Sequence, residues 1–140
     1  MGMGRRTLFE VMAGVIAAGS TLQAGELQPI IFDPDQVKPD PTTYGNIRIY
    51  CNGPTAGLKN LSVGSLQLKP GEQPHPPHTH PDEELLLVME GSGQITINGN
   101  PSAAGPGVIL YVPPNVLHGI KNTGDKPLKF SFIKWIAESS

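Results

Sequence analysis

Residues 71–91 read GEQPHPPHTHPDEELLLVMEG and place histidines and acids directly before an apolar run. His78 and His80 are two residues apart, and on an extended chain positions i and i+2 project to the same side. Both imidazoles can therefore face one ion. Glu84 opens the run 85–89, which is short enough for a strand, so its carboxylate can approach that ion from an adjoining segment. The segment predicts half of a metal site.

A second segment, residues 107–122, reads GVILYVPPNVLHGIKN and predicts the complementary half of the site. Its first apolar run ends at Pro113-Pro114-Asn115, which is typical of a turn that reverses a strand. His118 stands at the start of the next short apolar run. We therefore interpret His118 as the fourth candidate ligand.

Together these segments resemble the paired motifs of the cupin superfamily. The matching positions are His78, His80, Glu84 and Gly91 in the first motif, and Gly107, Pro113, Asn115, His118 and Asn122 in the second. Gly71 lies one residue further from His78 than the family pattern has it, and Asn115 stands where the family usually has glycine. A loop accommodates one extra residue, and Asn tolerates positive φ better than other non-glycine residues. The resemblance covers roughly residues 60 to 135.

Short alternating runs separated by Gly, Pro and Asn predict an all-β domain. The predicted strands are 46–51, 61–68, 73–80, 84–90, 94–98, 108–112, 117–121 and 128–135. Periodicity alone fits either a sandwich or a barrel. The cupin resemblance implies a double-stranded β-helix, or jelly-roll barrel, with the ion inside. We expect the aromatic residues Tyr50, Tyr111, Phe130, Phe132 and Trp135 in the core, with the cavity wall as an alternative for Tyr111.

The first residues suggest export. Arg5 and Arg6 precede a small-residue apolar run at 11–18, which predicts a cleaved, twin-arginine-like signal over residues 1–24 and a periplasmic or secreted protein. The alternative is an N-terminal amphipathic helix that is retained. Residues 25–44 are rich in Pro and Asp and predict an extended arm, whose apolar knot at 30–32 packs on the barrel or on a second subunit. The barrel domain is predicted at 45–140, and the arm with an open sheet edge favours a homodimer.

The composition limits the classes of partner that we expect and the disulfides that the chain can form. The net charge is −2 with no basic stripe, which excludes nucleic acid as an expected partner, and no stable membrane anchor is expected once the signal is removed. A single cysteine excludes an intramolecular disulfide. Cys51 alternates with Ile47 and Ile49, which predicts a buried thiol, with a reactive thiol as the alternative.

The implied ligand set is three imidazoles and one carboxylate. This donor set favours one divalent transition metal ion, Mn, Fe, Co, Ni, Cu or Zn, over Ca or Mg. Octahedral coordination leaves positions open for substrate or oxygen, so the site is suited to chemistry. His75 fits no motif position and is interpreted as a surface loop residue, a substrate contact or an alternative ligand.

The resemblance implies an enzyme that acts on a small oxygen-rich organic substrate. Small single-domain cupins with this ligand set resemble quercetin-dioxygenase-like proteins, so the first expectation is a dioxygenase-type oxidoreductase, with Glu84 as a catalytic base. One alternative is a redox-neutral isomerase, lyase or decarboxylase. The other is a non-catalytic protein that binds a carbohydrate or another small ligand through its metal. Fold alone does not choose among these functions.

Overall fold

The regular structure of the chain is almost entirely strand. The computed structural model describes residues 26–139, in which the single helical segment is the three-residue 3-10 helix η1 (Pro34–Gln36). The strands are β2 (Asp40–Pro41), β3 (Gly45–Gly53), β4 (Leu58–Leu68), β5 (Glu83–Glu90), β6 (Gly93–Ile97), β7 (Asn100–Ala104), β8 (Ile109–Val112), β9 (His118–Asn122) and β10 (Leu128–Ala137). The all-β prediction is therefore confirmed.

The predicted export signal, residues 1–24, lies outside the described residues. Within 26–139 there is no helix with the length and apolar character that a membrane crossing requires.

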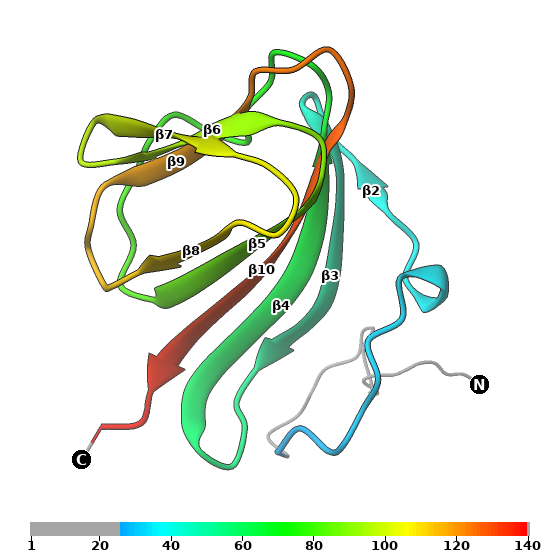
Figure 1. Cartoon of the computed structure of the whole chain (residues 1–140). Helices are drawn as coiled ribbons and strands as arrows, with labels where there is room; N and C mark the ends of the chain where they lie inside the picture. Colours follow the sequence, from blue (N-terminus) through cyan, green and yellow to red (C-terminus); the bar gives the residue numbers. More distant parts are fainter. Residues whose placement is uncertain (1–25, 140) are drawn as a thin grey trace. The chain divides into compact units, whose positions relative to one another are not determined.

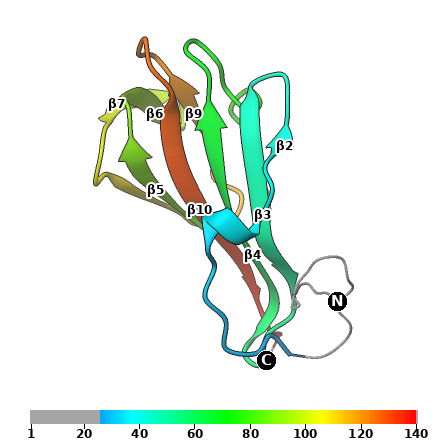
Figure 2. The same ribbon diagram turned by 90° about the vertical axis from the view of Figure 1, so that its right-hand side faces the viewer.

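The strands form two sheets. Their orders are β2-β3-β4-β10-β5-β8 and β7-β6-β9, and β6 pairs antiparallel with both of its neighbours. Figure 1 shows the smaller sheet lying across from β5 and β8. β5 and β8 also pair antiparallel, in a register that sets Glu84 opposite Val112. At the other edge of the larger sheet, Asp40 pairs with Ile47, and Figure 2 shows β2 running beside β3.

Internal contacts divide the chain into two compact units. Among the described residues, the first comprises 26–38, 48–64 and 135–139, and the second comprises Pro39–Ile47 and Ser65–Lys134. In the first unit, Phe32 of the arm stacks on Tyr50 with ring centroids 5.8 Å apart, whereas Ile31 is 88% exposed. The predicted apolar knot therefore contributes one packed ring from the arm.

The hydrophobic core lies in the second unit, and its members follow the two-residue period of the strands. In β5 the residues Glu84, Leu86 and Val88 are buried, and in β10 the buried set includes Phe130 and Phe132. The other core members are Leu66, Leu68, Ile95, Ala104, Leu110, Val112, Ile120 and Leu128. Because Glu84 shares its face with Leu86 and Val88, its carboxylate is directed inward.

Several predicted features of the fold are wrong. Tyr50 and Trp135, which are expected in the core, are only half-buried and lie outside it. Residues 73–80 form no strand, because Pro74, Pro76 and Pro77 have no backbone N–H for a ladder, and a single bridge joins His78 to His118. Tyr111 belongs to neither the core nor the cavity: it is 50% exposed and donates a hydrogen bond to Glu83 at 2.8 Å. Its position in β8 faces away from the buried Leu110 and Val112.

Two strands were not predicted, β2 and β7. β7 contains Pro101 and small residues, which gives it a weak strand signal. The dipeptide Asn98-Gly99 before β7 is a sequence signal for a two-residue hairpin turn. In the structure both residues have the positive φ that such a turn requires, 50° and 81°.

Candidate metal centre

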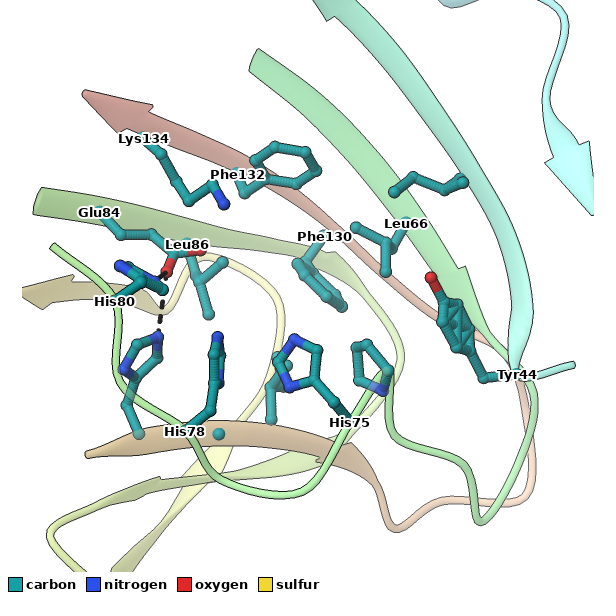
Figure 3. Close-up of a pocket in the computed structure, with 15 residues that line it drawn as sticks. Tyr44, Leu66, His75, His78, His80, Glu84, Leu86, Phe130, Phe132 and Lys134 are labelled. Carbon is teal, nitrogen blue, oxygen red and sulfur yellow. Dashed lines mark hydrogen bonds and ion pairs between the residues drawn. The ribbon is translucent and has the colours of Figure 1, made fainter. Parts of the chain in front are cut away.

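The four candidate ligands reach one region from three elements. Glu84 is the second residue of β5, His118 is the first residue of β9, and His78 and His80 lie on the loop between β4 and β5. Figure 3 shows the labelled residues His78, His80 and Glu84 directed into a common pocket. The structure therefore brings together all four residues that the motifs selected.

The loop that carries His80 is fixed by a turn between β8 and β9. The backbone N–H of Asn115 donates to the carbonyl of His80 at 2.8 Å. Asn115 adopts φ 63°, the left-handed conformation in which a glycine is usual and Asn is tolerated. The departure from the family motif at this position thus keeps the turn.

The three histidines form a compact cluster. The candidate ligand atoms of His78, His80 and His118 all lie within 4.8 Å of one another. Glu84 is not a member of this cluster, but its Oε1 lies 2.8 Å from Nε2 of His80 and 3.0 Å from Nε2 of His118. The carboxylate therefore bridges two of the three imidazoles.

The hydrogen bonds of Nδ1 in His80 and His118 show which nitrogen of each ring faces the centre of the histidine cluster. Nδ1 of His118 lies 2.8 Å from the carbonyl of Val116, and Nδ1 of His80 lies 3.2 Å from the carbonyl of Asp82. Because a carbonyl only accepts, each Nδ1 carries the hydrogen, and each neutral ring keeps its lone pair on Nε2. Metal-binding histidines are oriented in this way by backbone carbonyls.

Two lone pairs directed at one carboxylate oxygen require a cation, either a proton on a ring or a metal ion. Metal ligands about 2.1 Å from an ion and at right angles to each other are about 3.0 Å apart. The contacts from Glu84 to His80 and His118, 2.8 and 3.0 Å, have this spacing. The chemistry of the donor set thus fits one divalent ion.

The electrostatics of His78 suit a ligand. Burial, together with the positive charges that His75, His118 and His80 can carry, lowers the pKa of His78 to about 4. The ring is therefore neutral near pH 7 and keeps a lone pair for an ion. Its Nδ1 is buried and has no hydrogen-bond partner among the described residues.

Glu84 and His118 shift each other's titration in opposite directions. Burial raises the pKa of Glu84, but the hydrogen bonds from His118 and His80 outweigh it, so the net pKa lies below 4.5. The hydrogen bond to Glu84 raises the pKa of His118 above 6.5, against the effect of burial. Glu84 is therefore ionised at neutral pH, as a metal ligand must be.

The cluster forms one wall of a cavity of about 230 Å³. The remaining walls are largely apolar, with Leu66, Leu86, Phe130 and Phe132 among their residues. Phe130 and Phe132 are thus both core residues, as predicted, and cavity residues. A volume of this size fits a small organic molecule.

His75 is exposed but lies at the same cavity. Its ring is edge-on to His78 with centroids 3.8 Å apart, and it lines the pocket. This position combines two of the expectations for His75, a loop residue and a residue within reach of substrate.

Two cavity residues were missed by the sequence analysis, Tyr44 and Lys134. Tyr44 precedes β3 in a turn, where no periodic pattern identifies an inward position. Lys134 did have a signal, since it continues the two-residue period of Phe130 and Phe132 along β10.

Comparison with known proteins identifies the family. A family model described as "Cupin domain" matches residues 64–134, which include all four candidate ligands. The chain belongs to the cupin family. The predicted jelly-roll barrel is confirmed for this cupin by its structural neighbours. KdgF from Halomonas sp. superposes with a TM-score of 0.63 at 16% identity, covering 76% of this chain and 94% of that chain, a likeness of fold alone.

Two relatives extend over most of the cupin chain. Dimethylsulfoniopropionate lyase DddW of Ruegeria pomeroyi is 36% identical over 124 residues, which cover 83% of this chain and 80% of the relative. Protein SchB of Streptomyces halstedii is 31% identical over 99 residues, which cover 70% of this chain and 71% of the relative. The first relative is a lyase, so the comparison favours the redox-neutral alternative over the expected dioxygenase.

Proposed function

We propose that this cupin is a metal-dependent lyase that eliminates a leaving group from a small organic acid. The observation that carries the proposal is the 36% identity to a dimethylsulfoniopropionate lyase over 83% of this chain. The histidine cluster and the small apolar cavity support it, because they provide an ion site beside a space for a small molecule.

The proposed ligands are His78, His80, Glu84 and His118. The three histidines lie within 4.8 Å of one another, and Glu84 contacts two of them. A divalent ion held by these residues would supply Lewis acidity, which would make the C–H bond next to a substrate carboxylate more acidic.

We assign proton removal to Glu84. Its carboxylate is buried on β5 beside the cavity and is ionised at neutral pH, because His80 and His118 hold its pKa down. The proton on the carbon next to the substrate carboxylate passes to Glu84. The C–H electron pair forms a carbon–carbon double bond, and the bond to the leaving group breaks with its electrons on that group. For dimethylsulfoniopropionate the products are acrylate and a neutral sulfide, and no oxidant is consumed.

The test is product formation by metal-loaded protein. Purified protein reconstituted separately with Fe, Mn, Co, Ni and Zn is incubated with dimethylsulfoniopropionate, and released dimethyl sulfide is measured by gas chromatography with oxygen uptake recorded in parallel. We expect sulfide and acrylate in equal amounts without oxygen uptake. Metal-loaded protein that consumes oxygen with a flavonol and releases no sulfide would overturn the lyase in favour of the dioxygenase.

Glu84→Gln and His118→Ala separate the two roles. His118→Ala is expected to lose the ion and with it the activity. Glu84→Gln keeps an amide oxygen that can bind an ion weakly but cannot take a proton. We therefore expect Glu84→Gln at saturating metal to remain inactive, and full activity of this variant would exclude Glu84 as the base.

A further inference from the structure

Lys134 places a positive charge on the wall of the apolar cavity. It lies on β10 two residues after Phe132 and four after Phe130, and both of these phenylalanines are buried. Side chains two apart on a strand share a face, so the stem of Lys134 runs along the cavity side of the sheet. The residue is half-buried and lines the cavity.

The ammonium group has no carboxylate partner among residues 26–139. Glu84, the acid of this cavity, directs Oε1 to His80 and His118, and no ion pair joins it to Lys134. Figure 3 shows Lys134 extending toward the end of the cavity where Glu84 lies. A cation that lacks a carboxylate partner and lies beside largely apolar walls attracts an anion that enters the cavity.

The two ends of the cavity differ in character. Figure 3 shows Lys134 and Glu84 at one end and Tyr44 and Leu66 at the other, with Phe130 between them. An anionic group is favoured near the cation at the first end. An apolar or onium group is favoured beside the aromatic rings at the second end, because ring faces attract cations and apolar groups alike.

We propose that Lys134 is the specificity-determining residue of this cavity and that it binds the carboxylate of the substrate, with the remainder of the molecule extending toward Phe130 and Tyr44. The substrate class is therefore a small carboxylate with an apolar or onium tail. This inference rests on the proposed function, because it assumes that the cavity is the substrate site. It concerns how the substrate is bound, and it is tested by measuring binding without turnover.

The experiment compares a carboxylate with its neutral amide. Zn-loaded protein is titrated with butyrate and with butyramide, and the dissociation constants are measured from NMR chemical shifts. Lys134→Met removes the charge at similar length, and Lys134→Arg keeps it. Lys129→Met is the matched control, because Lys129 lies on the same strand and its ammonium is 3.6 Å from the exposed Glu90. Bound zinc and the melting temperature are measured for each variant.

We expect the wild-type protein to prefer butyrate, and Lys134→Met to bind butyrate about tenfold more weakly or worse while its affinity for butyramide is unchanged. Lys134→Arg and Lys129→Met should retain the preference. If Lys134→Met prefers butyrate as strongly as wild type does, or if wild-type protein shows no preference, the inference is overturned.

These outcomes are distinct from those of the lyase assay. Lysine-dependent binding of butyrate without release of any sulfide would remove the proposed reaction and leave the recognition role. Release of sulfide with a Michaelis constant that Lys134→Met leaves unchanged would support the proposed lyase reaction and overturn the recognition role of Lys134.

Discussion

His78 and His118 exchange both of their backbone hydrogen bonds. The N–H of His78 donates to the carbonyl of His118 at 2.9 Å, and the N–H of His118 donates to the carbonyl of His78 at 3.0 Å. This single antiparallel bridge ties the proline-rich loop to the first residue of β9. Two candidate ligand positions that lie far apart in sequence are therefore held together by backbone hydrogen bonds.

The first prediction concerns metal content. Replacing His78, His80 or His118 by alanine should reduce the bound metal to about one-tenth or less of the wild-type amount, because each change removes a nitrogen donor from a cluster of three. The metal is measured by inductively coupled plasma mass spectrometry of proteins purified in parallel.

His75→Ala is the matched control for these variants. Its ring contacts His78 but is exposed and lies outside the cluster, so metal content should stay near the wild-type value. Equal metal in all four variants would remove the ligand assignment. The three cluster variants should also lose the rise in melting temperature that added metal gives to wild-type protein, since ligand binding stabilises the folded state.

A second prediction concerns Gly119, which follows His118 in β9. A Cβ placed at Gly119 would lie 3.2 Å from both Cα and Cγ of Pro77, the residue before His78. Gly119→Ala should therefore push the loop away by a few tenths of an ångström and weaken metal binding about tenfold without unfolding the protein.

The control for Gly119→Ala is Gly105→Ala, because a Cβ at Gly105 meets nothing within 4 Å. Metal dissociation constants of both variants are measured by competition with a chromophoric chelator. An unchanged constant for Gly119→Ala would show that the loop adjusts freely and that the backbone bridge does not position His78.

The sequence predicted the strands that alternate and the residues that the motifs select. β5 and β10 show the expected two-residue period, and the histidines that the motifs select, at 78, 80 and 118, lie in one cluster. The i, i+2 argument for His78 and His80 reached the right cluster through a wrong local structure. The two residues lie on a loop, and the contact of His78 depends on a bridge to β9 that no local pattern reveals.

Other features depend on contacts between distant segments. Tyr111 has the apolar neighbours of a core residue, but the register of β5 and β8 turns it outward, where it meets Glu83. The reaction type was the hardest property to predict from the sequence, because the same set of metal ligands serves several reactions. The preference for a lyase comes from comparison with a related protein and not from any residue pattern in this chain. The export signal, the domain limits and the homodimer stay predictions.

A third prediction concerns Asn122, the last residue of β9, which is fully buried. Its amide nitrogen donates to the carbonyls of Leu68 and Lys126 at 3.0 and 2.8 Å, and its Oδ1 accepts from the N–H of Gly124 at 2.9 Å. Alanine would leave these buried groups without partners, so Asn122→Ala should lower the free energy of unfolding by about 3 kcal/mol.

Urea unfolding in the presence of a chelator measures this loss independently of the metal. Asn100→Ala, a change at an exposed asparagine in β7, should alter the free energy of unfolding by less than about 0.5 kcal/mol. Similar values for the two variants would show that the hydrogen bonds of Asn122 are replaced by water without cost.

The last prediction concerns Cys51 in β3, which is 8% exposed. Burial raises the pKa of this thiol from 9.0 to about 12, although a backbone hydrogen bond near Val63 lowers it slightly. Between these two pH values the unfolded chain releases the thiol proton and the folded chain keeps it. The unfolded state then binds fewer protons, so the stability of the fold decreases as the pH rises, by at most about 1.4 kcal/mol per pH unit.

Comparison with Cys51→Ala isolates this effect from other groups that titrate at high pH. Urea unfolding is measured from about pH 8 to about pH 11, and the wild-type free energy should fall more steeply than that of Cys51→Ala above about pH 9. Native wild-type protein near pH 8 should also react with a thiol reagent far more slowly than the urea-unfolded protein, since the thiolate is the reactive form and the native thiol is neutral. Parallel pH curves combined with rapid labelling of the native protein would instead show that Cys51 is an accessible, reactive thiol.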